Sequence, residues 1–178
     1  MQHKAFIYYV IKFIAFFLFF YVGTYCYIGI TSPGGYYFPY LDHYFNYVNW
    51  LRSLLLNGAK AILQILGFEG NITDKYHLQI NHANSVQLVY ACLGYGVISF
   101  WFAFVITSSI NTIHKIKWML AGFLLIVFSN MLRLAILLIA IYKGWTLWFN
   151  LEHHFVYNVI AYGIVGLLCW GFLKREDK

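Results

Sequence analysis

The sequence predicts an all-α integral membrane helical bundle, and three observations lead to that class. Hydrophobic residues make up 62% of the 178-residue chain and charged residues only 10%, whereas soluble domains carry roughly a quarter charged residues. The mean hydropathy is +0.67. Four stretches reach the about 20 mostly apolar residues that cross a bilayer. We therefore expect about four transmembrane helices, an amphipathic or re-entrant helix and a short extramembrane hairpin, in a single membrane-embedded domain over residues 1–178.

The four predicted spans follow the continuous apolar runs. They cover roughly residues 5–30, 91–110, 118–142 and 155–173. Lys12 is tolerated near the start of the first run because its long side chain can reach the interface. This run lacks a signal-peptide cleavage pattern and is crowded with Phe and Tyr, so we expect a retained anchor.

Residues 49–67, "NWLRSLLLNGAKAILQILG", predict a different kind of helix. Arg52, Lys60 and Gln64 fall near one helical face, and the leucines and isoleucines lie mostly elsewhere. This pattern is typical of an amphipathic helix that lies in the interface or packs against the bundle. A shallow re-entrant course is the alternative.

A polar stretch before the second span predicts a hairpin. "YHLQI" and "SVQLV" alternate polar and apolar residues on either side of "NHAN". Alternation is typical of half-buried strands, and an Asn-rich centre is typical of a turn. We expect this hairpin to lie outside the membrane.

The cations set the expected orientation. The N-terminus, the loop between the second and third spans and the C-terminal tail carry Lys4, Lys115, Lys117, Lys174, Arg175 and Lys178. With four spans these regions share one side, and the positive-inside bias makes that side the cytoplasm. Both termini are then cytoplasmic. The net charge of +6 does not indicate nucleic-acid binding, because the cations are dispersed along the chain.

Three segments bring reactive types of side chain to a similar depth on the outer side. Cys92 starts the second span, and His153 and His154 open the fourth. Arg133 lies within "FLLIVFSNMLRLAILLIA", about 12–14 Å below the outer end of the third span. An arginine at the centre of a spanning helix costs about 2.5–3.5 kcal/mol on insertion scales, which makes it a candidate functional residue. Asn130 shares its face one turn earlier and is a candidate support.

Each of these residues also has a structural interpretation. A buried cysteine is usually a small hydrophobe, and we interpret Cys26 and Cys169 in that way. Arg133 could instead clamp the bundle through a salt bridge or carbonyl groups. No acidic residue lies inside a predicted span, so we expect a thiolate, a substrate or a reaction intermediate as its anion. The two histidines could simply begin a helix, and adjacent positions do not match the i, i+4 pair of a helical metal site. We expect no metal and no cofactor.

A thiol, a guanidinium and an imidazole at one site favour acyl transfer. The thiolate is the nucleophile, and a neighbouring cation favours it over the thiol. A Cys–His pair is a usual activated nucleophile, and guanidinium donors suit the oxyanion of a tetrahedral intermediate. We therefore expect Cys92 to attack a peptide carbonyl and form an acyl-thioester. Hydrolysis and transpeptidation both remain open as the second step.

The ordered set "ACLG", "NMLR" and "HHFVY" resembles the exosortase/archaeosortase superfamily, and most of all the small exosortase F type of Bacteroidetes-like bacteria. The resemblance covers residues 89–164. It implies a multi-spanning cysteine transpeptidase of the bacterial inner membrane whose active site faces the periplasm. The implied substrates are C-terminal sorting signals of exported proteins, made of a short motif, a hydrophobic span and a basic cluster, which enter from the lipid.

The resemblance also implies roles for individual residues. Cys92 would be the acyl-thioester nucleophile, and Arg133 the proton donor or oxyanion stabiliser. His153 would be the transition-state stabiliser or base, with His154 as the fallback. One departure is Leu93, because the family often has a serine after the cysteine. Its hydroxyl donor is missing here.

Two other classes of function stay open on the sequence alone. A non-catalytic membrane scaffold would use Arg133 to hold helices together and would not need Cys92. A small anion or proton-coupled transporter would bind an anion at Arg133 and relay protons through the histidines, but the paired broken helices typical of transporters are missing. A thiol redox protein is disfavoured, because no second cysteine lies near Cys92 in the sequence.

Overall fold

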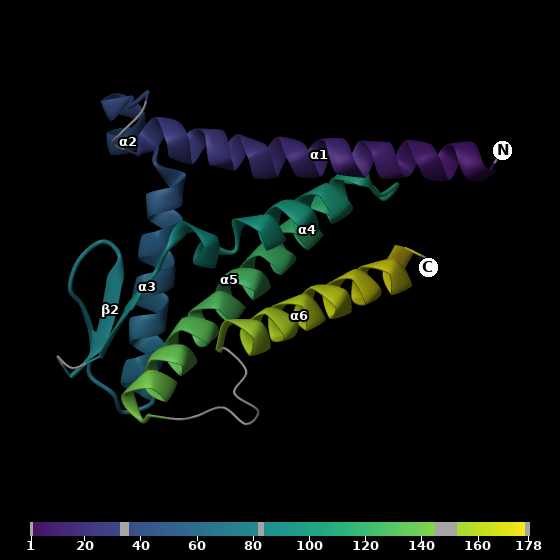
Figure 1. Ribbon diagram of the computed structural model, residues 1–178. Helices are drawn as coiled ribbons and strands as arrows, with labels where there is room; N and C mark the ends of the chain where they lie inside the picture. Colours follow the sequence, from purple (N-terminus) through teal and green to yellow (C-terminus); the bar gives the residue numbers. More distant parts are fainter. Residues whose placement is uncertain (1, 33–35, 82–83, 145–152, 177–178) are drawn as a thin grey trace. The chain divides into compact units, whose positions relative to one another are not determined.

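The computed structural model describes residues 2–32, 36–81, 84–144 and 153–176, with the side chains of 2–3, 5, 84, 153–158 and 175–176 left out of that description. Within these ranges the chain is mostly helical (Figure 1). The elements in chain order are α1 (Gln2–Thr31), α2 (Pro39–Phe45), α3 (Tyr47–Ile65), β1 (Gly70–Ile72), β2 (His77–Ile80), β3 (Asn84–Gln87), the 3-10 helix η1 (Tyr90–Leu93), α4 (Tyr95–Thr107), α5 (Thr112–Tyr142) and α6 (His153–Glu176).

Two of the described helices are long and apolar enough to cross a membrane, Phe6–Thr31 within α1 and Thr112–Tyr142, which is α5. At 1.5 Å per residue both exceed the about 30 Å of a bilayer's hydrocarbon core. The apolar side chains of α1 are widely exposed, with Phe6, Ile11 and Phe19 at 68%, 60% and 71%. The first and third predicted spans are confirmed as long apolar helices, and the number of membrane crossings stays a prediction.

The chain divides into two compact units. The first contains Met1–Tyr47, Tyr95–Leu124 and Gly171–Lys178, and the second contains Val48–Gly94 and Leu125–Trp170. The single-domain organisation expected from the sequence stays a prediction.

In the first unit, α1 and α4 lie side by side (Figure 1). Aromatic rings form contacts between these two helices. Phe13 packs edge-to-face on Phe100 with ring centres 5.4 Å apart, and the rings of Tyr21 and Tyr95 lie 5.5 Å apart. Such ring pairs contribute about 0.5–1.5 kcal/mol each beyond their buried area. The many Phe and Tyr residues of the first apolar run therefore form a packing surface as well as an apolar one.

Trp101 forms the centre of this unit's core. Its side chain is fully buried, and its Nε1 donates a hydrogen bond to the backbone carbonyl of Trp118 at 3.1 Å. Its ring also packs edge-to-face against Phe172. Gly122 on α5 makes room for the indole, because a Cβ at that position would overlap it.

The second unit contains a three-stranded antiparallel sheet in the order β1-β2-β3. β2 pairs with β3 with His77 opposite Gln87, so the predicted hairpin is confirmed. β1 adds a strand that the sequence does not predict, because its three residues "GNI" are too short for an alternation to be recognised. Leu78 and Ile80 of β2 are fully buried and give the sheet an apolar face.

α3 is amphipathic, as predicted, but its buried face is not the one expected. The buried residues form one helical stripe and are Val48, Arg52, Leu55, Leu56, Ala59 and Leu63. Arg52 is only 1% exposed, so its assignment to a polar outer face with Lys60 and Gln64 is wrong. Leu55 and Ala59 lie three and seven residues after Arg52 and therefore on the same face of the helix, so the burial of this apolar face also buries Arg52.

The second predicted span is interrupted near its start. η1 ends at Leu93, Gly94 has a φ of +77°, and α4 begins only at Tyr95. Glycine adopts this left-handed conformation without the strain that other residues meet, so it ends the turn. The prediction of one continuous helix over residues 91–110 is therefore wrong at its N-terminal end. The 13 residues of α4 extend about 20 Å.

Candidate functional site

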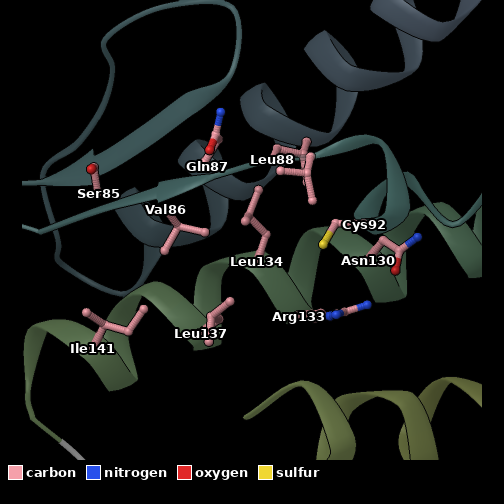
Figure 2. Close-up of a pocket in the computed structure, with 11 residues that line it drawn as sticks. Ser85, Val86, Gln87, Leu88, Cys92, Asn130, Arg133, Leu134, Leu137 and Ile141 are labelled. Atoms are coloured by element: carbon pink, nitrogen blue, oxygen red, sulfur yellow. The ribbon is translucent and has the colours of Figure 1, made fainter. Parts of the chain in front are cut away.

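A cavity of about 650 Å³ in the second unit is lined by Cys92, Asn130 and Arg133 (Figure 2). The rest of its lining comes from β3 and the residues after it and from one stripe of α5: Ser85, Val86, Gln87, Leu88, Val89, Leu134, Leu137 and Ile141. Its volume lies within the about 300–1,000 Å³ typical of ligand pockets. An apolar wall with a few convergent polar groups is the usual composition of such a site.

Cys92 reaches the cavity from η1. Its backbone N–H donates to the Val89 carbonyl at 2.9 Å, which closes the 3-10 turn. The thiol is free and half-buried, and Figure 2 shows the sulfur directed toward α5. Because Gly94 ends the turn, the thiol is held on a tight loop before α4 rather than inside a long helix. Cys92 lines the cavity from this position.

Asn130 and Arg133 reach the same cavity from one face of α5. The Asn130 side chain donates from Nδ2 to the Leu93 carbonyl at 3.4 Å, so it ties α5 to the turn that carries Cys92. Arg133 is half-buried and lies about 14 Å along the helix from the end of α5 at Tyr142, and its depth in a membrane stays a prediction. The structure thus brings three of the predicted residues together, and their catalytic roles stay predictions.

The remaining predicted residues are placed less fully. α6 begins at His153, as expected for the start of the last helix, but the side chains of His153 and His154 lie outside the described residues. Cys169 is half-buried, and Cys26 is exposed on α1, whose surface is mostly uncovered by the rest of the described chain. The interpretation of both as small hydrophobes stays a prediction. Neither of these cysteines lines the cavity.

A second arginine supports the segment that carries Cys92. The guanidinium carbon of Arg52 lies 4.4 Å from the centre of the Tyr76 ring and 4.6 Å from that of the Tyr90 ring. Both distances fit cation–π contacts. Its Nη1 donates to Asn49 Oδ1 at 2.6 Å. Among the described residues no carboxylate pairs with this guanidinium, and its Nε and Nη2 are buried without a hydrogen-bond partner.

Arg52 therefore joins α3 to the β1–β2 turn through Tyr76 and to η1 through Tyr90. The turn is held in place by Asp74, whose Oδ1 accepts from the backbone N–H of Tyr76 at 2.7 Å and from that of His77 at 2.9 Å. The Tyr76 N–H, followed by the His77 side chain, holds the pKa of the Asp74 carboxyl below its usual value. We call Arg52, Tyr76 and Tyr90 the arginine clamp. The sequence carried a signal for it, since Arg52 stands in the apolar stripe of α3.

Gly94 should be the most sensitive glycine of this site. A Cβ there would overlap the Asn130 amide nitrogen, and the left-handed backbone costs about 1–2 kcal/mol for any other residue. We expect Gly94→Ala to lower the free energy of unfolding by this backbone cost and by about 1–3 kcal/mol more, because the Asn130 side chain already occupies the space that the new methyl group needs. Denaturant unfolding in detergent measures the difference.

Gly67→Ala is the matched control for this substitution. Its φ is +83°, close to that of Gly94, but a Cβ there would meet nothing within 4 Å. Gly67→Ala therefore meets the same cost of a left-handed backbone as Gly94→Ala, but its new methyl group overlaps no other atom. Equal losses of stability in the two variants would show that the contact between Gly94 and Asn130 does not matter.

The arrangement has the parts that attack on a carbonyl requires. The thiol of Cys92, the amide of Asn130 and the guanidinium of Arg133 belong to residues that line one cavity, and most of the other lining residues are apolar. Amide and guanidinium donors are groups that stabilise oxyanions. Comparisons with known protein-family models, curated proteins and solved structures return no match to this chain.

Proposed function

We propose that this chain is a membrane-embedded cysteine peptidase or transpeptidase of the exosortase kind, which cleaves C-terminal sorting signals of exported proteins and transfers them to an acceptor. The observation that carries the proposal is the cavity that Cys92, Asn130 and Arg133 share. A lone cysteine is usually a small hydrophobe. A thiol, an amide and a guanidinium around one cavity, in the motifs "ACLG" and "NMLR", favour the catalytic interpretation.

The proposed reaction has two steps. Cys92 Sγ attacks the carbonyl carbon of the scissile peptide bond, the C–S bond forms, and the C–N bond then breaks as the amine leaves with a proton. A second nucleophile, which is water, an amine or a lipid, attacks the resulting thioester. It forms a new bond to the carbonyl carbon, and the sulfur leaves and regains its proton. Arg133 stabilises the oxyanion in both steps, because its guanidinium is a permanent donor.

The proton transfers are assigned to the histidines at the start of α6. A Cys–His pair activates the nucleophile, and the same imidazole then protonates the leaving amine. His153 takes this role by its place in the motif "HHFVY", with His154 as the fallback. This assignment rests on the resemblance and on the start of α6 at His153.

The proposed location is the bacterial inner membrane, with both termini in the cytoplasm and the cavity toward the periplasm. The long apolar helices and the exposed apolar surface of α1 favour a lipid environment. Lys115 and Lys117 lie near the start of α5, whereas Asn130 and Arg133 lie in its second half. The positive-inside bias then puts the cavity on the outer side.

A covalent adduct tests the proposed function. Purified protein in lipid vesicles is incubated with the C-terminal tails of exported proteins that share a short motif, a hydrophobic span and a basic cluster. Mass spectrometry of the digested protein should find the N-terminal part of a tail attached to Cys92 in a bond that hydroxylamine cleaves. Cys26 and Cys169 serve as internal controls and should carry no adduct.

Substituted proteins complete this test. Cys169→Ala should keep the adduct, and Cys92→Ala should lose both the adduct and the cleaved product. A scaffold would support its partners equally well with Cys92→Ala, and a transporter would keep its flux. Cleavage at the wild-type rate by Cys92→Ala would overturn the proposal.

A further inference from the structure

β3 is an end strand of its sheet, and its free edge runs beside the candidate site. The strand order β1-β2-β3 gives β3 one partner among the described strands. Exposed edges are usually protected by proline, lysine or a bulge, because they pair readily with another extended chain. The four residues of β3, "NSVQ", contain no proline and no charge. None of the residues that usually block pairing therefore protects this edge, and its backbone groups can bond to another extended chain.

The hydrogen-bond register shows which backbone groups point outward. In an antiparallel pair, residues alternate between those that bond to the partner strand and those that bond away from it. Leu88 donates from its N–H to the Tyr76 carbonyl at 2.7 Å, and Val86 stands opposite Leu78 two residues earlier. Val86 and Leu88 thus bond inward to the side of β2. The N–H and C=O groups of Ser85 and Gln87 point to the free edge.

This free edge leads directly to the thiol. Every residue from Ser85 to Val89 lines the cavity, and Cys92 follows on η1 (Figure 2). The opposite wall is α5, with Leu134, Leu137 and Ile141. From Gln87 to Cys92 the chain advances roughly 13 Å, at about 3.3 Å per residue in the strand and 2 Å in the 3-10 turn. An extended peptide covers that distance with about four residues.

We infer that β3 is the docking strand for the substrate, which adds to the sheet as a further strand and so presents a peptide bond to Cys92. The inference rests on the proposed function and specifies how the same site holds its substrate. Backbone pairing with Ser85 and Gln87 supplies affinity without regard to sequence, and the α5 wall selects apolar side chains on one face of the peptide. Strand addition to an exposed edge is a common form of peptide recognition.

The geometry makes three demands on the substrate. It must be extended, it must offer apolar side chains at alternate positions, and its docked residues must lie about four residues from the scissile bond. A segment that is helical up to the cleavage point could not pair with β3. The substrate region at the cavity is therefore an extended segment next to the hydrophobic span of the tail.

The probe that tests this is a short peptide of alternating valine and threonine with a C-terminal vinyl sulfone, long enough to reach Gln87. The thiol of Cys92 adds to the vinyl group, so an S–C bond forms and the thiol proton moves to carbon. Two further peptides carry N-methyl groups on the odd or on the even amides. Docking on β3 predicts that one methylated set labels Cys92 about tenfold more slowly than the unmethylated peptide does. A tenfold change corresponds to the loss of about 1.4 kcal/mol in hydrogen bonding.

The other methylated set is the matched control and should label at close to the rate of the parent peptide. Gln87→Pro gives an independent measurement. Proline removes an N–H that points to the free edge and leaves the pairing with β2 intact, so it should slow peptide labelling about tenfold. Gln87→Ala keeps this N–H and should slow labelling far less than Gln87→Pro does. The labelling rate of each variant is divided by its rate of reaction with iodoacetamide at Cys92, which cancels any change in the reactivity of the thiol.

The outcomes separate this inference from the proposed function. Equal labelling by both methylated sets, or labelling of Gln87→Pro at the wild-type rate, would overturn docking on β3. The peptidase proposal would still stand in that case if Cys92 forms an adduct with sorting tails. Conversion of a dimer to a monomer by Gln87→Pro, with unchanged peptide labelling, would assign the edge to a second copy of this chain. Absence of any peptide or tail adduct on wild-type Cys92 would overturn both.

Discussion

Replacing Arg133 by glutamine should slow cleavage of sorting tails by about 10²–10³-fold, the usual loss when one donor to an oxyanion is removed. Arg133 lines the same cavity as Cys92, and glutamine is shorter and uncharged. The oxyanion exists only in the transition state and the intermediate, so kcat should fall while KM changes little. Arg133→Lys keeps the charge without the planar fork and should fall between the two. Rates are measured with purified protein in lipid vesicles.

Lys117→Gln is the control for Arg133→Gln. Lys117 is an exposed cation on the same helix and does not line the cavity, so its loss should leave the rate unchanged. Thermal unfolding of each variant separates a catalytic role from a structural one. If Arg133 only holds the bundle together, Arg133→Gln will lower the unfolding temperature while the folded fraction cleaves at the wild-type rate. That result would exclude it from the reaction.

Sequence patterns were sufficient where one physical signal dominates. Hydropathy predicts α1 and α5, because a long apolar run has few alternatives to a long helix. Alternation predicts the β2–β3 hairpin, because a period of two matches only a strand with one buried face. Depth along the helices predicts that Cys92 and Arg133 lie near one another; both line one cavity, and their convergence on a substrate stays a prediction. None of these inferences needs the details of packing.

The patterns failed where a tertiary contact decides. The break at Gly94 is not visible in hydropathy, because glycine also occurs within spanning helices; the Asn130 amide beside it requires this glycine. β1 forms only because β2 offers an edge. The burial of Arg52 depends on two tyrosine rings, of which Tyr76 is 24 residues away in sequence. A charged residue usually marks an exposed face, and for this reason the sequence pattern did not reveal that Arg52 belongs to the buried apolar stripe of α3.

Replacing Arg52 by alanine should lower the free energy of unfolding by roughly 3 kcal/mol, within the range for truncating a long buried side chain. Arg52 is 1% exposed and fills the space between the Tyr76 and Tyr90 rings. Alanine leaves a cavity there, removes two cation–π contacts and leaves Asn49 without the donor it has at 2.6 Å. Tyr90 begins the turn that carries Cys92, so cleavage should fall as well. Denaturant unfolding in detergent measures the first effect.

Arg52→Met separates the filling of space from the charge. Methionine is shorter than arginine but of similar volume, packs well against aromatic rings and removes a buried cation with two nitrogens that lack hydrogen-bond partners, and an unsatisfied buried group costs about 1–3 kcal/mol. Its free energy of unfolding should therefore return to the wild-type value or exceed it. Cleavage should stay low, because only the planar guanidinium holds both rings of the arginine clamp in register. Full activity in Arg52→Met would show that this arginine fills space and does not position Cys92.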